Sequence, residues 1–251
     1  MNFKAKSLLL NSILIAVTTS LLTTILHEGA HYLTALFLGV PAELHHNYVS
    51  TPDTTPAQTA TIISASGPLF SLIFGILSLI ISVKTVRISL FKLFLLWLGM
   101  QGILTFFGYL LIAPIAAEGD TGKVFDYLGF PVYLSVGIAV ASFIFINKVF
   151  SGCARYFTYY KAAEFTDKNE DCRQLLIYPI FCSIIFVTLL NLPVVIWVSL
   201  LPTIFMPMTY FAAMGAYKGL KITYPQVIID RISIPLLILT IFCIAVFRYL
   251  V

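Results

Sequence analysis

The feature that most constrains this chain is a series of long apolar stretches with almost no charge inside them. Of the 251 residues, 59% are hydrophobic and only 10% are charged. A soluble domain typically carries about 25% charged residues, so this chain lacks the polar surface needed to face water on all sides. We therefore expect an all-α polytopic membrane protein, multi-pass and integral to the cell membrane.

Seven apolar stretches approach or exceed the roughly 20 residues that a helix needs to cross a bilayer. They cover residues 7–38, 58–82, 90–117, 131–147, 175–191, 194–216 and 233–250. If the fifth and sixth were one segment, it would be too long for a single crossing. We place a tight turn at Asn191-Leu192-Pro193, because proline suits the start of a helix and not its interior. The prediction is six to seven transmembrane helices.

Lysine and arginine are distributed unequally between the two ends of the predicted spans. Seven alternating spans with a cytoplasmic N-terminus place 13 of these residues on the cytoplasmic side and only Lys123 and Arg248 on the other. Merging the fifth and sixth spans changes the count to 11 against 4. Cytoplasmic loops carry an excess of positive charge, so this count favours seven spans.

Charge and cysteine content exclude two other classes of protein. The formal net charge of +4 is small and spread along the chain, so we expect no nucleic-acid partner. The four cysteines form no CxxC pair, which favours apolar packing over a disulfide framework or a zinc knuckle.

One predicted span carries three ionisable side chains within five residues, His27-Glu28-Gly29-Ala30-His31. Residues i and i+4 lie on one face of a helix, so both imidazoles can reach one metal ion. Glu28 beside them can take a proton from a water that the metal activates. Ionisable groups at membrane depth are costly and mark functional sites. The pattern predicts a zinc site able to hydrolyse an amide bond.

A catalytic zinc ion takes three protein ligands and keeps one position open. We expect the third ligand to be Asp120, just beyond the third span, because the first and third spans run in the same direction. Pro114 should end the third helix and let Asp120 fold back toward the histidines. Glu118 and Asp126 are nearby alternatives. Gly67-Pro68 in the second span lies at a matching depth, where a glycine permits close helix approach.

These motifs and their order resemble the site-2 protease family of intramembrane zinc metalloproteases. The HExxH helix is followed by a segment at 40–56, with a short strand expected over 42–49, then by Ala65-Ser66-Gly67-Pro68 and by Pro114 through Gly119-Asp120. The resemblance covers about the first 130 residues. It implies a three-helix metalloprotease core at 1–130 and additional transmembrane helices at 131–251.

Carried over residue by residue, the resemblance implies a zinc ion held by His27, His31 and Asp120, with Glu28 as the catalytic base. It also implies that a transmembrane protein or peptide substrate pairs as a strand near 42–49. The implied substrate-binding residues are Ala42, Glu43, Leu44, Gly67 and Pro68. The implied activity is hydrolysis of peptide bonds within or near transmembrane segments, as in regulated intramembrane proteolysis.

Two other functions are compatible with the sequence. Ser71 and Leu111 stand where the family usually has asparagine, which suggests a catalytically inactive zinc-binding scaffold as an alternative. The intact Glu28 argues against it, because a scaffold needs no general base. A secondary transporter should carry polar or broken-helix features in two related halves, and the second half has no ionisable residue at mid-span.

Overall fold

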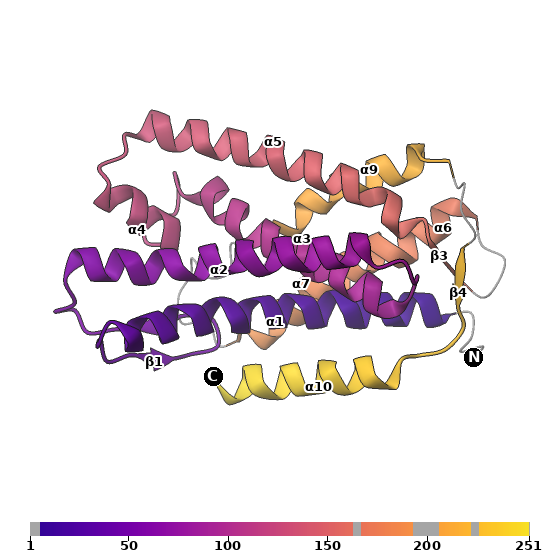
Figure 1. Cartoon of the computed structure of the whole chain (residues 1–251), viewed down its shortest axis with the longest axis horizontal. Coiled ribbons are helices and arrows are strands. Elements are labelled where there is room, and N and C mark those ends of the chain that lie inside the picture. The colour runs from indigo at the N-terminus through magenta and orange to yellow at the C-terminus, as the bar shows by residue number, and fades with distance from the viewer. Residues whose placement is uncertain (1–5, 163–166, 193–205, 222–225, 251) are drawn as a thin grey trace.

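The computed structural model describes residues 6–162, 167–192, 206–221 and 226–250 (Figure 1). The described part of the chain is predominantly helical, and five helical segments in it are long and apolar enough to cross a membrane. They are α1 (Ser7–Phe37), α2 (Ala57–Lys84), α3 (Leu90–Ile112), α5 (Val132–Phe157) and the continuous segment Lys168–Leu190. These five segments indicate a multi-pass membrane protein.

Shorter elements connect the long helices. The segment Lys168–Leu190 consists of α6 (Lys168–Cys172), a π-helical turn η2 (Arg173–Ile177) and α7 (Tyr178–Leu190). The other helical elements are α4 (Asp120–Tyr127), the 3₁₀ turn η4 (Met206–Tyr210), α9 (Phe211–Gly219) and α10 (Ile234–Tyr249). Two small sheets pair β1 (Glu43–Leu44) antiparallel with β2 (Val49–Ser50), and β3 (Tyr160–Ala162) parallel with β4 (Val227–Ile229).

The first five predicted spans are helices, with shifted ends. α5 continues ten residues beyond the predicted stretch 131–147, because Cys153, Ala154 and Phe157 pack into the core. Of the predicted sixth span, 194–216, residues 194–205 lie outside the described residues, and the rest belongs to the helical elements η4 and α9, which end at Gly219. α10 has 16 residues, fewer than the roughly 20 that usually cross a bilayer. Six or seven spans therefore stay a prediction.

The short strand expected over residues 42–49 is instead a hairpin. Glu43 pairs with Ser50 and Leu44 with Val49, and the chain reverses between them. The His45 amide donates to the Tyr48 carbonyl at 3.0 Å, and the two rings stack at 4.3 Å. These contacts close a turn within the expected strand.

The core lies between α1, α3 and the helices that cover them. Trp97 on α3 stacks on Tyr210 and meets the edge of Phe157. α2 and α3 approach very closely, since a Cβ on Gly102 would lie 2.6 Å from the Ser71 carbonyl oxygen and 2.7 Å from the Gly75 Cα. Small residues allow such contact between membrane helices.

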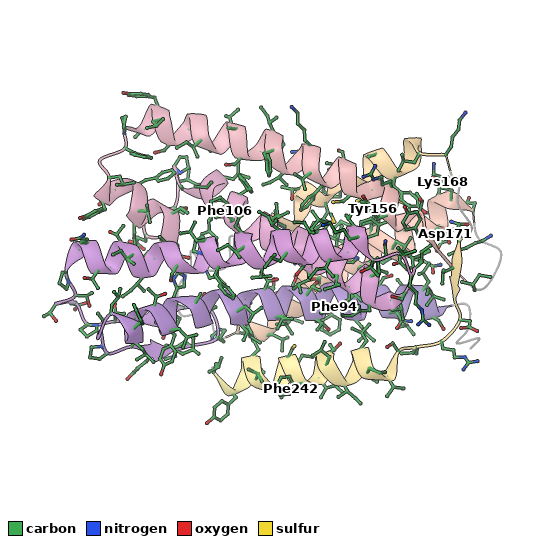
Figure 2. All side chains as sticks on the ribbon, in the orientation of Figure 1. Phe94, Phe106, Tyr156, Lys168, Asp171 and Phe242 are labelled. Atoms are coloured by element: carbon green, nitrogen blue, oxygen red, sulfur yellow. The ribbon has the colours of Figure 1, made fainter. Side chains whose placement is uncertain are left out.

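Polar contacts hold α10 against α1. The hydroxyls of Thr18 and Thr240 are 2.7 Å apart, and the Asn11 side chain bonds the Arg231 carbonyl and the Ser233 amide. The outer side of α10 is apolar and exposed, as Phe242 shows in Figure 2. Exposed apolar side chains are expected where a helix faces lipid.

The two ends of the bundle are formed by different elements. The N-terminal end of α1 lies at the same end as α6, β3 and β4, where Figure 2 shows Tyr156, Lys168 and Asp171 together. The β1–β2 hairpin and α4 lie at the opposite end (Figure 1). The residues of the HExxH motif lie in the half of α1 that leads to this hairpin end.

Candidate metal centre

The three predicted metal ligands converge on one point in the structure. His27 and His31 lie one turn apart on α1, and their Nε2 atoms are 3.1 Å apart. Asp120 Oδ2 lies 3.0 Å from His27 Nε2 and 3.2 Å from His31 Nε2. Both histidines are buried, and the Asp120 side chain is 21% exposed. Residues 93 positions apart in the chain thus form one group that can hold a metal ion.

The outer nitrogens of the two imidazoles fix their tautomers. His31 Nδ1 lies 2.6 Å from the Ile63 carbonyl oxygen, which can only accept, so Nδ1 carries the proton. His27 Nδ1 lies 3.1 Å from Ser71 Oγ, and that hydroxyl already donates to the Gly67 carbonyl at 2.9 Å. His27 therefore also donates through Nδ1. In the neutral tautomers that result, both Nε2 atoms turn lone pairs toward the Asp120 carboxylate.

Three electron-pair donors this close together require a proton or a cation between them. A tetrahedral zinc ion with bonds of about 2.0–2.1 Å separates its nitrogen and oxygen ligands by about 3.3 Å. The observed separations of 3.0, 3.1 and 3.2 Å lie close to that value. The donor set, two imidazoles and one carboxylate, is also one that zinc accepts in catalytic sites. The residues present thus fit the metal.

Asp120 reaches the histidines because the chain turns sharply after α3. The helix ends at Ile112, two residues before Pro114, and a tight turn leads into α4, which begins at Asp120 itself. The Thr121 hydroxyl donates to the Tyr109 carbonyl at 2.7 Å and fastens α4 to the end of α3. A Cβ on Gly122 would lie 2.2 Å from the Ala116 carbonyl oxygen, so only glycine fits against this turn.

The charge state of Asp120 suits a metal ligand. Burial by itself would raise the pKa of its carboxyl. When a proton instead of a metal ion lies between the Nε2 atoms and the carboxylate, the positive charge of His31 and the hydrogen bonds from the imidazoles act more strongly and bring the pKa of Asp120 below its usual value. Asp120 is therefore an ionised carboxylate that accepts a cation readily.

Glu28 lies beside the three ligands and not among them. It is buried and lines the same cavity of about 240 Å³ as His31 and Asp120. Tyr109 also lines this cavity, and its ring stacks on His27 at 5.1 Å with the planes 7° apart. The cavity thus brings the carboxyl group of Glu28 together with two of the three ligands.

The Gly-Pro pair of α2 makes room for the His31 ring and removes one hydrogen bond from the helix backbone. A Cβ on Gly67 would lie 2.3 Å from His31 Nε2 and 2.6 Å from its Cε1. Gly67 therefore gives the His31 ring the room to face His27. Pro68 is buried one residue later, and α2 continues through it. Proline has no N–H to donate to the Ser64 carbonyl one turn before.

The predicted substrate-binding residues of the hairpin lie outside this cavity. Ala42, Glu43 and Leu44 belong to β1 and the residue before it, and the cavity is instead lined by Asn47, Tyr48, Val49 and Thr51. The second strand, paired to the first, is the one that borders the site. Of the segment 42–49 that was expected to bind substrate, only the last three residues line the cavity.

The two alternative acidic ligands are not part of the metal group. Glu118 is exposed and lines the cavity, and Asp126 is exposed on α4. Sequence reasoning did not identify Ser71 and Ile63 as partners of the histidines. The Ile63 carbonyl has no side-chain signature, whereas a serine four residues after Gly67 on a membrane helix is a usable signal.

Comparisons with protein-family models, with curated proteins and with solved structures gave no match to this chain. The site geometry is therefore the basis for assigning a function.

Proposed function

We propose that this protein is an intramembrane zinc metalloendopeptidase, which hydrolyses peptide bonds within or near transmembrane segments of other membrane proteins. One observation carries the proposal. Two buried imidazoles, whose outer nitrogens contact Ser71 and the Ile63 carbonyl, bring their Nε2 atoms to 3.0 and 3.2 Å from one carboxylate oxygen of Asp120, and Glu28 lines the adjoining cavity.

The resemblance to the site-2 protease family supports the same function. In both cases an HExxH helix, a β-structured segment, a Gly-Pro helix and an aspartate after a broken helix follow in this order. The close fit of Gly67 against His31 gives the Gly-Pro motif a physical reason in this chain.

Each residue of the site has a defined task in this reaction. His27, His31 and Asp120 would hold the zinc ion, which supplies a Lewis acid that polarises a peptide carbonyl and makes water more acidic. Glu28 removes a proton from the attacking water and delivers it to the leaving amine nitrogen. Ser71 and the Ile63 carbonyl keep the imidazoles in the tautomer that binds metal.

The hairpin supplies a place for the substrate. A peptide bond inside a helix is shielded by its own hydrogen bonds, so the scissile segment must be extended. β2 borders the cavity, and among the described strands it pairs only with β1. An unwound substrate segment would add to β2 as a further strand and bring one of its carbonyls to the site.

The test combines metal analysis with cleavage of a model transmembrane peptide by purified protein. We expect about one zinc per wild-type chain, with cleavage. Glu28→Gln should keep the metal and lose cleavage by several orders of magnitude, and His31→Ala should lose both. Cleavage by Glu28→Gln protein would refute the mechanism, whereas bound zinc without wild-type cleavage would favour the inactive scaffold.

A further inference from the structure

The turn of the β1–β2 hairpin, residues 45–48, contains two buried polar side chains. His46 is 2% exposed and Asn47 is 9% exposed, although both belong to a loop. Side chains of a connecting loop normally lie on the surface, so their burial means that the hairpin turn is covered by another part of the molecule. The elements that cover it come from the second half of the chain.

Asn47 contacts the end of α7. Its Nδ2 donates to Asn191 Oδ1 at 3.1 Å, which joins residues 144 positions apart in the chain. The Asn191 Nδ2 donates to the Val187 carbonyl, one turn earlier on α7, at 2.7 Å. A carbonyl only accepts hydrogen bonds, so the nitrogen of Asn191 faces Val187 and its oxygen faces Asn47. The backbone of α7 thus sets the direction of the contact with the hairpin.

His46 is covered by α10, whose C-terminal end lies beside the hairpin (Figure 1). Its ring meets the Phe247 ring edge to face, with centroids 5.1 Å apart. Neither ring nitrogen of His46 has a hydrogen-bond partner among the residues that the structure describes. Arg248, the next residue on α10, donates to the carbonyls of Leu190 and Leu192 at 3.2 and 2.7 Å. These carbonyls precede and follow the asparagine at the end of α7, so α10 supports that end where the hairpin turn contacts it.

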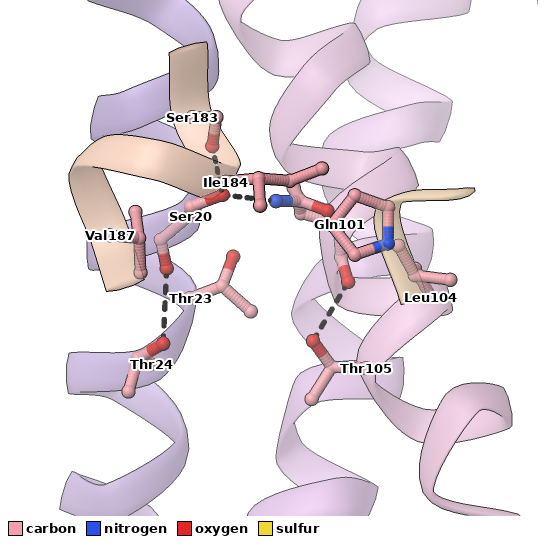
Figure 3. A pocket seen from close by; sticks show the side chains of 10 residues that line it. Ser20, Thr23, Thr24, Gln101, Leu104, Thr105, Ser183, Ile184 and Val187 are labelled. Carbon is pink, nitrogen blue, oxygen red and sulfur yellow. Dashed lines mark hydrogen bonds between the residues drawn. The ribbon is translucent and has the colours of Figure 1, made fainter. Parts of the chain in front are cut away.

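The helix that holds the hairpin turn is itself fixed in the bundle. Figure 3 shows Ser183 on α7 and Gln101 on α3 meeting Ser20 on α1. The hydroxyls of Ser20 and Ser183 are 3.1 Å apart, and Ser20 Oγ accepts from the Gln101 amide. Val187 lies one turn after Ser183 on the same helix. Polar contacts with α1 and α3 therefore set the position of α7 just before the end that meets the hairpin.

The hairpin turn also belongs to the metal cavity. Asn47 lines that cavity together with Tyr48 and Val49, and β2 begins two residues after Asn47. Asn191 is buried and is not among the residues that line the cavity. The contact between the two asparagines thus fixes the start of the strand that borders the metal centre, from a residue outside the cavity.

The hairpin needs such support because its own pairing is short. Only two residues of each strand are paired. A two-stranded hairpin is marginally stable in water at best, so it keeps one position only when other elements hold it. The contacts with α7 and α10 supply that support at the turn.

We propose that Asn47 and Asn191 are positioning residues for the substrate. The contact between them holds the hairpin turn on α7, so that β2 keeps the position in which a substrate strand can add to it. This role rests on the peptidase function proposed above, whereas the contact itself does not. The second half of the chain supplies none of the three metal ligands and would thereby contribute to substrate binding.

Hydrogen exchange of the whole purified protein in detergent tests the contact. Asn47→Ala and Asn191→Ala should each increase amide exchange of residues 43–50 by about 2–10-fold, the range expected for the loss of one hydrogen bond. The double variant should exchange no faster than either single variant, because all three lack the same contact. Asn147→Ala is the matched control, since Asn147 donates to the carbonyl four residues before it on α5, as Asn191 does on α7. It should exchange as wild type.

A second variant tests the same contact from the surface. Arg248 is exposed, so Arg248→Met leaves the core unchanged and removes only the bonds to the carbonyls at the end of α7. Exchange of the hairpin amides should again increase, by a smaller factor than in Asn191→Ala. Unchanged hairpin exchange in Asn47→Ala, Asn191→Ala and Arg248→Met would overturn the proposal.

Cleavage kinetics test the role in substrate binding. In Asn191→Ala the KM for the model transmembrane peptide should rise by about 2–10-fold, while kcat and zinc content stay at the wild-type values. Because Asn191 lies outside the cavity, loss of a direct contact with the substrate cannot explain such a change. Faster hairpin exchange with an unchanged KM would overturn the positioning role. Absence of wild-type cleavage would overturn the peptidase function and this role with it, and the exchange result would still decide the contact.

Discussion

His31 is held on three sides before any metal binds. Its Nδ1 donates to the Ile63 carbonyl, its Nε2 faces His27 and Asp120, and its ring lies where a side chain at Gly67 would have to go. Such outer contacts set the tautomer and orientation of a ligand in advance. Because the ring is already in place, metal binding does not have to order it, and no binding free energy is lost in doing so.

Replacing Gly67 by alanine should displace His31. The added methyl carbon would lie within 2.3–2.8 Å of three ring atoms, so the imidazole must leave its position or α2 must move. We expect zinc affinity to fall by about 10-fold or more, measured by competition with a chelator. Gly29→Ala, where an added Cβ meets nothing within 4 Å, is the control and should retain wild-type affinity. Equal affinity in both variants would contradict the fit between Gly67 and His31.

Replacing Ser71 by alanine removes the acceptor of the His27 Nδ1 proton. Loss of an outer-shell partner typically costs about 10–100-fold in metal affinity or activity, and we expect a loss in this range. Ser78→Ala changes a buried serine two turns further along α2 and serves as the control. Zinc-binding isotherms of both variants test this prediction. Equal affinities would show that the contact between Ser71 and His27 does not contribute to zinc binding.

The HExxH residues could be predicted from the sequence because their contact depends only on a spacing of four along one helix. Asp120 could be predicted because Pro114 marks the end of α3. The contact between Ser71 and His27 could not be predicted, since it joins α1 to α2 and depends on how the two helices are rotated relative to each other. The contact between His31 and the Ile63 carbonyl could not be predicted either, because every residue type has a backbone carbonyl.

Among the elements, α4 and the hairpin show why short segments are harder to predict than spans. The long helices follow from apolar length alone, which is why all five were expected. The hairpin contains only two-residue strands, and its turn is closed by a backbone bond from His45 to Tyr48 that no periodicity reveals. The helix α4 is eight residues long and is set in place by Thr121 and by the packing of Gly122.

Changing Gly122 to alanine should move α4 and with it the third ligand. The new methyl carbon would meet the backbone oxygens of Ala116 and Ala117 at 2.2 and 2.6 Å, and backbone atoms cannot rotate away. We expect weaker zinc binding with the two histidine ligands retained, seen as a changed absorption spectrum of cobalt-substituted protein. Asp126→Asn on the same helix should give the wild-type spectrum, because Asp126 lies outside the metal group. A changed spectrum in Asp126→Asn would instead favour that residue as a ligand.

At the scale of the whole molecule, the candidate metal centre lies toward one end of the bundle and several basic residues lie toward the other. Lys84, Arg87 and Lys168 lie at or near the end that contains the N-terminus of α1, and the hairpin and α4 lie at the other. The Lys168 ammonium bonds the carbonyls of Lys218 and Leu220, which brings further basic residues to the same end. Lys123, one of the two basic residues predicted for the opposite side, lines the metal cavity.

Because basic residues favour the cytoplasmic side, the hairpin end should face away from the cytoplasm. We expect a membrane-impermeant thiol reagent to label Asp53→Cys in intact cells, since Asp53 is exposed in the loop between β2 and α2. Arg87→Cys, exposed between α2 and α3, should react only after the cells are permeabilised. Both substitutions are made in a variant in which the four native cysteines have been replaced. Labelling of Arg87→Cys but not Asp53→Cys in intact cells would show the reverse orientation, with the candidate metal site open to the cytoplasm.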